Sequence, residues 1–194
     1  MKRVVVYLHG FNSSAQALKA KETAAYLQTL HSAIDFKQPT IPDVPDEAVQ
    51  FLNAYIEDLQ KQYDDIVLIG SSLGGFYATW LAEKFDLRAV LVNPAIKPHE
   101  LMHKYLGCNE NPYTHVRYEL TASHMQTLQS LYKDHIHRPQ RFLILLQMAD
   151  EVLDATDASA RFYRSSCRID PAGDHRFEGF EKSLPMIFDW LLNH

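Results

Sequence analysis

Gly70-Ser71-Ser72-Leu73-Gly74 follows the apolar run Asp65-Ile66-Val67-Leu68-Ile69 directly and leads into Phe76-Tyr77-Ala78-Thr79-Trp80-Leu81-Ala82. This order predicts a strand, a tight turn and a helix. The glycines on either side of Ser72 allow the sharp reversal, because a Cβ at either position would collide with the strand or the helix. Such a turn, called a nucleophile elbow, holds a serine hydroxyl clear of the sheet. The predicted nucleophile is therefore Ser72, with Ser71 as the less central alternative.

Short apolar runs that alternate with amphipathic segments indicate the fold class. The predicted strands cover 4–8, 33–37, 66–69, 89–92, 142–147 and 167–169. The predicted helices between them cover 14–30, 47–62, 75–85, 156–163 and 180–192. Nearly continuous apolarity predicts strands that are covered on both faces. We therefore expect an α/β fold with a doubly wound, mostly parallel six-stranded sheet in the order 2-1-3-4-5-6 and a ligand at the carboxyl ends of its strands.

The segment 95–139 breaks this alternation. It carries many histidines and aromatic residues and no convincing strand, while 98–106 and 121–133 have helical patterns. A compact domain rarely keeps so long a connection without purpose. We therefore expect one domain over residues 1–194, in which 95–139 is inserted as a small helical cap over the elbow. Candidates for the lining of an acyl pocket or, equally, for the cap's own core are Leu101, Tyr105, Tyr113 and Met125.

Charge and composition exclude several classes of protein. The chain has 194 residues and a formal net charge of −5, with 19 basic and 24 acidic residues and no basic stripe, so we expect no nucleic-acid partner. Cys108 and Cys167 are too few for a disulfide framework and lack a C-x-x-C companion, which predicts buried free thiols in a reducing cytoplasm. The apolar run 4–8 is too short for a signal peptide, and no run approaches the roughly 18 residues of a membrane span.

Two later segments supply a base and an acid for Ser72. A serine hydroxyl is a weak nucleophile at neutral pH, so it needs a base within hydrogen-bonding reach, and the base needs an orienting group. His175 lies in the loop before the last predicted helix, and Asp150 follows the fifth predicted strand. The order serine, aspartate, histidine is typical of elbows of this kind. Glu151 and Asp154 remain alternatives for the acid, although Asp154 is also suited to cap the helix that follows it.

The loop after the first predicted strand is suited to stabilise an oxyanion. Gly10 lets the backbone curl there so that an N–H group points at the developing negative charge. The expected donors are the backbone N–H groups of Phe11 and Leu73. The ring of His9 is suited to fix this loop. The expected substrate contacts at the strand ends are His9, Asn12 and Asn93.

Other side chains give weaker indications. Ser13 or Ser14 is equally suited to contact a ligand or to cap the next helix. His99 and His103 have a spacing that can bind zinc on a helix, but no third ligand is evident. The sequence contains neither G-x-x-x-x-G-K-S/T nor G-x-G-x-x-G. We therefore expect neither a metal nor a cofactor.

Together, five stretches resemble the YqiA-like small bacterial esterases of the α/β-hydrolase superfamily, and they lie at 7–14, 70–78, 93–95, 150–154 and 173–177. His-Gly-Phe-Asn-Ser-Ser in the first stretch and Asn-Pro-Ala in the third make this resemblance narrower than the elbow alone. It implies a minimal α/β-hydrolase fold and cofactor-free hydrolysis of carboxyl esters or acyl thioesters. It also implies that Ser72 is the nucleophile, Asp150 the acid and His175 the base. Arg176 stands where the family is expected to have alanine, which alters charge near the pocket.

These features lead us to expect a serine esterase that hydrolyses carboxyl esters, or acyl thioesters, of small or medium acyl groups through an acyl-enzyme intermediate. An acyl-CoA thioesterase or acyltransferase needs the same three side chains, and its phosphate contacts would come from Arg88, Lys97 and Lys104. A non-catalytic ligand-binding domain is the alternative from another class, because a fold does not fix a function. The sequence leaves the acyl chain and the oligomeric state open.

Overall fold

A single parallel sheet organises the molecule. The computed structural model describes residues 2–30 and 33–193. Its six-stranded sheet has the order β2-β1-β3-β4-β7-β8, and every neighbouring pair is parallel. The strands are β1 (Arg3–Leu8), β2 (Ile34–Lys37), β3 (Asp65–Ser72), β4 (Arg88–Pro94), β7 (Phe142–Gln147) and β8 (Ser166–Asp170). The predicted α/β class and strand order are confirmed.

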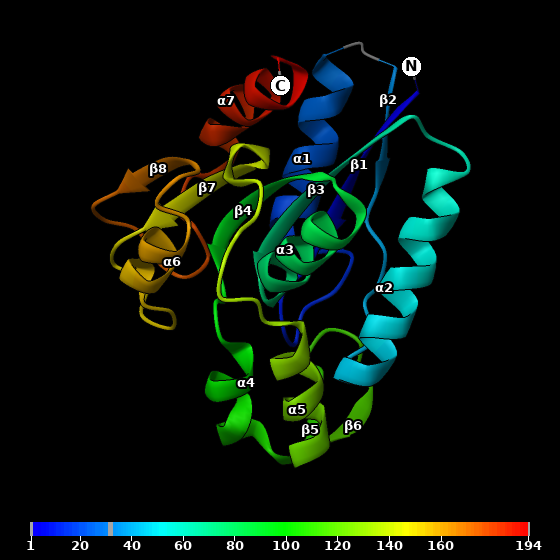
Figure 1. Cartoon of the computed structure of the whole chain (residues 1–194), viewed down its shortest axis with the longest axis vertical. Coiled ribbons are helices and arrows are strands. Elements are labelled where there is room, and N and C mark those ends of the chain that lie inside the picture. The colour runs from blue at the N-terminus through cyan, green and yellow to red at the C-terminus, as the bar shows by residue number, and fades with distance from the viewer. Residues whose placement is uncertain (1, 31–32, 194) are drawn as a thin grey trace.

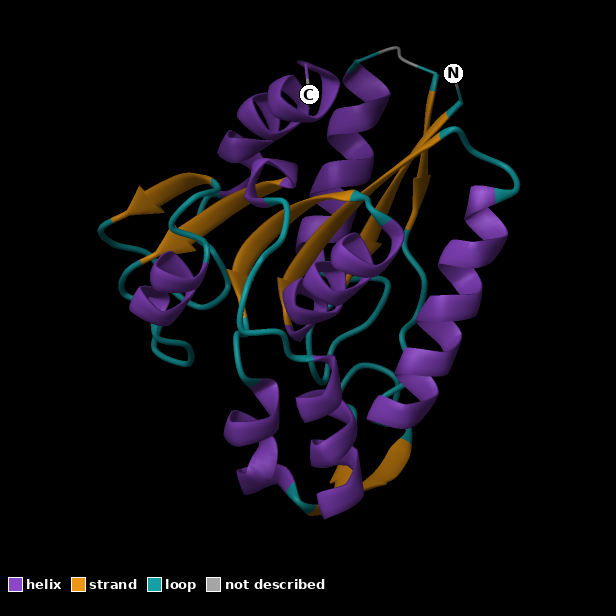
Figure 2. Cartoon of the chain, in the orientation of Figure 1, coloured by secondary structure: helices purple, strands orange, loops and turns teal. Residues whose placement is uncertain are grey.

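Helices cover both faces of this sheet (Figures 1 and 2). One face packs against α1 (Leu18–Thr29) and α7 (Phe180–Asn193). The other face packs against α2 (Pro45–Gln60), α3 (Leu73–Phe85) and α6 (Ala155–Arg161). Successive side chains of a strand point to opposite faces of the sheet, so the apolar side chains of one strand pack into two different cores. The continuous apolarity of the central strands follows from this double burial.

The edge strands differ from the central ones. In β8 the first four residues are exposed, and β2 alternates between partly buried and exposed positions. Cys167 lies in β8 and is exposed, and Cys108 is also free and exposed. The prediction of buried thiols was therefore wrong, because an edge strand lacks the double cover that the apolar pattern suggested.

The segment 95–139 contains helices and an unpredicted hairpin. Its elements are α4 (Pro98–Leu101), η1 (Met102–Tyr105), β5 (Gly107–Glu110), β6 (Arg117–Leu120) and α5 (Ala122–Leu131), and the short helix η2 (Pro139–Arg141) leads into β7. β5 and β6 form an antiparallel pair. The helical patterns are confirmed, but the expectation of no strand was wrong. α4, η1, β5, β6 and α5 lie together beyond the carboxyl ends of β3 and β4, at the lower end of Figure 1, whereas η2 lies at the amino end of β7. We keep the name cap segment for residues 95–139.

Candidate active site

The turn at Ser72 is as tight as the sequence requires. Ser72 joins β3 to α3 with φ 55° and ψ −122°, a backbone conformation that residues other than glycine rarely adopt. A Cβ on Gly70 would lie 2.3 Å from the carbonyl oxygen of Gly74, and a Cβ on Gly74 would lie 2.1 Å from that of Leu8. Both glycines are therefore needed for the close approach of the strand, the helix and β1.

The His175 ring lies within hydrogen-bonding reach of both the Ser72 hydroxyl and the Asp150 carboxylate. Nε2 of His175 is 3.1 Å from Oγ of Ser72. Nδ1 of the same ring is 2.8 Å from Oδ2 and 3.0 Å from Oδ1 of Asp150. The His175 side chain is 22% exposed and that of Asp150 is 2% exposed. The imidazole therefore bridges a hydroxyl at the pocket and a carboxylate shielded from water.

Asp150 is held as a carboxylate by its neighbours. Burial alone would raise its pKa, but the hydrogen bond from His175 and the backbone N–H groups of Leu153 and Val152 together hold that pKa below its usual value. The other two acids have different contacts. Glu151 accepts the backbone N–H of His175 at 3.0 Å, and Asp154 caps α6 by accepting the N–H of Thr156 at 2.8 Å.

Two buried amides fix the loop that carries His175. Asn93 accepts the N–H of Gln147 at 2.9 Å and donates to the carbonyl of Asp174 at 3.0 Å. Oε1 of Gln147 accepts the N–H groups of Asp174 and Glu178 at 3.0 and 2.8 Å, and its Nε2 donates to the carbonyl of Glu178 at 2.8 Å. The Asn93 amide is buried and bonds to the chain itself, and its expected contact with substrate stays a prediction. Sequence reasoning missed Gln147, whose only signal is a polar side chain that closes an apolar strand.

His9 fixes the neighbouring loop in the same way. Its Nδ1 lies 2.9 Å from the carbonyl of Gly10, and its Nε2 accepts the N–H of Ile41 at 3.0 Å. Burial lowers the pKa of His9, which favours the neutral ring that can accept this bond. Both ring nitrogens of His9 have partners within the chain, and its expected contact with substrate stays a prediction. A Cβ on Gly10 would lie 3.2 Å from Cβ of Ser72, so this loop runs directly against the elbow.

Side chains of the hairpin hold the rest of this loop. Tyr118 donates its hydroxyl to Oδ1 of Asn12 at 2.5 Å, and the Phe11 ring packs against Tyr118 and Tyr105 with centroids 6.4 and 5.0 Å apart. Nδ2 of Asn111 donates to the carbonyl of Ser13 and to Oδ1 of Asp43 at 3.0 and 2.7 Å. The loop after β1 is therefore bound to the cap segment.

The helix that follows this loop begins later than expected. It starts at Leu18 with Ala17 as its N-cap, and no side chain caps it. Ser14 instead accepts the N–H of Gln16 at 3.1 Å. Ser13 or Ser14 as a helix cap was therefore a wrong prediction.

A cavity of about 270 Å³ opens beside Ser72 and His175. Its remaining lining comes from the loop after β1, the start of α3, the cap segment and the segment after β7, namely Phe11, Asn12, Leu73, Ala95, Pro98, Leu101, Met102, Lys104, Tyr105, Val152 and Leu153. Met125 lies in the core and Tyr113 is exposed away from this lining. Arg88 pairs with Asp65 at the start of β4, the end of the strand opposite to the cavity.

The described residues contain neither a cluster of metal-ligating side chains nor a membrane-spanning helix. No group of three or more His, Cys, Asp or Glu side chains within 2–30 and 33–193 is gathered as metal ligands would be. The His99 ring instead contacts that of Tyr132, with centroids 5.9 Å apart. Over the same ranges, none of the helices has the length and apolarity to cross a membrane.

The sequence is similar to those of a known protein family over almost its whole length. The model of a family described as "Uncharacterised protein family (UPF0227)" matches residues 4–192. The chain belongs to this family. One UPF0227 protein, from Pectobacterium carotovorum, is 26% identical over 187 residues, which cover 95% of this chain and 96% of that protein. Membership agrees with the expected YqiA-like resemblance.

Solved structures show the same fold. Alpha/beta hydrolase domain-containing protein 10 from mouse aligns with a TM-score of 0.72 at 15% identity, covering all of this chain (100%) and 90% of that one. A monoacylglycerol lipase from Paleococcus ferrophilus aligns with a TM-score of 0.68 at 18% identity, covering 98% of this chain and 94% of that one. This UPF0227 member therefore has the α/β-hydrolase fold.

Proposed function

We propose that this UPF0227 protein is a serine hydrolase that cleaves carboxyl esters through an acyl-enzyme intermediate. The observation that carries the proposal is the contact of His175 with both the Ser72 hydroxyl and the buried Asp150 carboxylate. A lipase among the solved structures with this fold supports the same class of reaction. The role of each residue follows from its place in the site.

In the first half-reaction, Oγ of Ser72 attacks the carbonyl carbon of the ester while Nε2 of His175 takes its proton. The negative charge that forms on the carbonyl oxygen would be held by the backbone N–H groups of Phe11 and Leu73. The N–H of Leu73 has no partner within its helix because it belongs to the first turn of α3. When the intermediate collapses, the alcohol leaves with the proton from His175.

Water completes the cycle. His175 removes a proton from a water molecule, whose oxygen attacks the acyl carbon, and Ser72 leaves and recovers its proton. Asp150 keeps Nδ1 of the ring protonated and stabilises the imidazolium that forms twice in each turnover. The cavity of about 270 Å³ beside Ser72 suits a small or medium acyl group, because its lining includes Leu101, Met102 and Leu153.

A thioester with a phosphorylated leaving group is the second candidate substrate. Lys104 favours it, because this cation lines the cavity and no ion pair is found for it among the described residues. A panel of esters and thioesters of matched acyl length separates the two candidates. A higher kcat/KM for acyl-CoA than for the matched simple thioester, lost in Lys104→Gln, would select the second.

Labelling by a fluorophosphonate tests the proposal directly. An activated serine reacts with this probe, whereas the hydroxyl of a non-catalytic binding domain does not. We expect labelling and ester hydrolysis to be abolished in Ser72→Ala and retained in Ser71→Ala. Intact protein that takes no label, or label that persists in Ser72→Ala, would contradict the assignment.

A further inference from the structure

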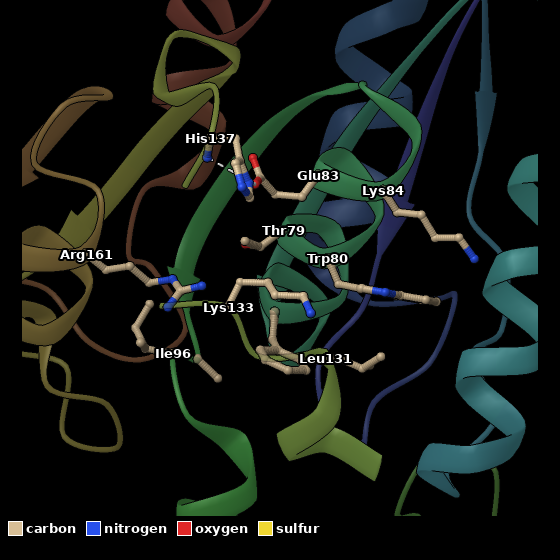
Figure 3. Close-up of a pocket in the computed structure, with 11 residues that line it drawn as sticks. Thr79, Trp80, Glu83, Lys84, Ile96, Leu131, Lys133, His137 and Arg161 are labelled. Atoms are coloured by element: carbon tan, nitrogen blue, oxygen red, sulfur yellow. Dashed lines mark hydrogen bonds and ion pairs between the residues drawn. The ribbon is translucent and has the colours of Figure 1, made fainter. Parts of the chain in front are cut away.

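A second cavity lies behind the one at Ser72. It has a volume of about 290 Å³ and is bounded by α3, the end of α5, the segment after β4 and Arg161 at the end of α6 (Figure 3). Among the described residues, Ala95 alone lines both cavities. Nothing in the proposed ester hydrolysis uses this second cavity, which we call the rear cavity.

Most of the rear cavity is apolar. Phe76 is 5% exposed, and the side chains of Trp80, Ile96 and Leu131 are partly buried against the same core. Figure 3 shows Trp80 and Leu131 on one side of the cavity and Ile96 on the other. These groups form a surface for the apolar part of a ligand.

Two cations line this apolar surface, and among the described residues neither makes an ion pair, although Glu83 and Asp134 act on Arg161 electrostatically. The Arg161 guanidinium stacks on the ring of Tyr132 at 4.4 Å from its centroid, and its Nη1 is buried with no hydrogen-bond partner. A buried donor left in this state is costly and is rare in folded proteins. Lys133 lies across the middle of the view between Arg161 and Trp80 (Figure 3), and it makes no ion pair with any described residue. An anionic oxygen placed between them would satisfy both.

The other charged groups limit the charge of such a ligand. Lys84 is bonded to Asn53 of α2 and points away from Arg161 in Figure 3. Glu83 contributes one negative charge and is 2.6 Å from Nδ1 of His137. Asp134 also acts electrostatically on Arg161, so the positive charges of Arg161 and Lys133 are balanced by the negative charges of Glu83 and Asp134 when His137 is neutral. A carboxylate adds one negative charge to this balance and a phosphate dianion adds two, so the site accommodates a carboxylate better.

We propose that the rear cavity is a second ligand site, which binds a small carboxylate with an apolar tail, such as a medium-chain fatty acid. Its carboxylate lies between Arg161 and Lys133, and its tail contacts Phe76, Trp80 and Leu131. The site is separate from the Ser72 cavity and does not depend on the proposed hydrolysis.

The fluorescence of Trp80 provides the test. The chain has two tryptophans, and Trp190 lies on the opposite face of the sheet. In Trp190→Phe, octanoate at pH 8 is expected to change the Trp80 emission with a Kd on the order of 0.1–1 mM. Octanamide has the same shape without the charge, and it is expected to bind about tenfold more weakly. Calorimetry on the parent protein gives the same comparison if Trp190→Phe does not fold.

Charge variants locate the ligand. Lys133→Gln changes an exposed residue and is expected to weaken octanoate about tenfold, as is Arg161→Gln. Arg164→Gln removes an exposed positive charge just beyond α6 and should leave the Kd unchanged. Protein labelled at Ser72 by fluorophosphonate should bind octanoate with the same Kd as unlabelled protein.

Five outcomes would overturn the inference. Octanoate that does not bind, or octanamide that binds equally, removes the carboxylate site. Arg164→Gln that weakens binding as much as Lys133→Gln indicates a general effect of net charge. Loss of binding after labelling places the ligand in the Ser72 cavity, and tighter binding of octyl phosphate than of octanoate excludes a site matched to a monoanion.

Discussion

The elbow and the histidine loop meet at one hydrogen bond but are held by different forces. Ser72 is fixed by steric exclusion, since Gly70 and Gly74 each leave no space for a Cβ. His175 is fixed through its neighbour Asp174, whose carbonyl and N–H bond to the side-chain amides of Asn93 in β4 and Gln147 in β7. A steric constraint fails when an atom is added, whereas a hydrogen-bonded loop weakens by steps as donors and acceptors are removed. The two regions should therefore respond differently to substitution.

Adding one methyl group to the elbow should have the largest effect. In Gly74→Ala the new Cβ would lie 2.1 Å from the Leu8 carbonyl oxygen, so we expect the free energy of unfolding to fall by more than about 4 kcal/mol. Gly107→Ala is the control, because a Cβ on Gly107 would have no atom within 4 Å and meets only the backbone strain of a positive φ, 101°, which Gly74 does not have. It should cost about 1–2 kcal/mol. Equal urea midpoints for the two variants would remove the steric account of the elbow.

Removing the acid should reduce turnover without unfolding the protein. Asp150→Asn keeps the shape of the side chain but favours the wrong tautomer of His175, so kcat should fall about 10⁴-fold. Asp154→Asn keeps a side-chain oxygen that can accept the Thr156 N–H and cap α6, so stability and kcat should both change little. Ester hydrolysis by the two purified variants checks this. A larger loss of kcat in folded Asp154→Asn would transfer the acid role to Asp154.

The amide anchor of the loop should give a graded response. Gln147→Leu leaves the N–H groups of Asp174 and Glu178 without their acceptor, and we expect kcat to fall about 10- to 100-fold with a smaller change in KM. Gln147→Glu keeps an acceptor but loses the donor to the Glu178 carbonyl, so it should recover part of kcat. If the two variants are equally impaired in kcat, Gln147 acts through packing and not through these bonds.

The loop after β1 is held by a group that can change its charge, because the His9 ring can take up a proton, unlike the elbow glycines and the amides of Asn93 and Gln147. Burial lowers the pKa of His9, so the folded protein binds this proton less readily than the unfolded chain does. The stability that the neutral ring contributes is therefore present above about pH 6.5 and is lost as the pH falls through that value. Between pH 7 and 5 the parent should lose up to about 1 kcal/mol more than His9→Gln.

Urea unfolding of both proteins at each pH measures that difference. The other histidines are common to parent and variant and cancel, including His99, whose pKa burial also lowers. Parallel stability profiles would mean that protonation of His9 does not break its bond to the Ile41 N–H.

The distinction between these regions also explains what the sequence could predict. The elbow is encoded within a few neighbouring residues, and a parallel sheet gathers the carboxyl ends of its strands at one edge. Ser72, Asp150 and His175 could therefore be expected to meet from their positions alone. Their catalytic roles remain a prediction that the labelling and the Asp150→Asn variant test.

Contacts between distant residues escaped the sequence patterns. The roles of Gln147 and Asn93 depend on which loop folds against them, and neither residue carries a periodic signal. The strands β5 and β6 are short and mostly polar, with Leu120 as the one buried residue among them, so no apolar alternation marked them. Cys167 was predicted to be buried because the sequence pattern marks a strand but does not indicate which strand lies at the edge of the sheet.

The hairpin's bonds to the loop after β1 restrict how substrates can reach Ser72. Tyr118 and Asn111 join the cap segment to Asn12, Ser13 and Asp43, so lifting this side away would break the same contacts that shape the proposed oxyanion site. An enzyme that opened there would lose its catalytic geometry in every cycle. Among the residues that the structure describes, the sides of the cavity formed by α4, η1 and the segment after β7 carry no such bonds to this loop, so we expect a change of substrate range to be more easily acquired at Leu101 than in the hairpin.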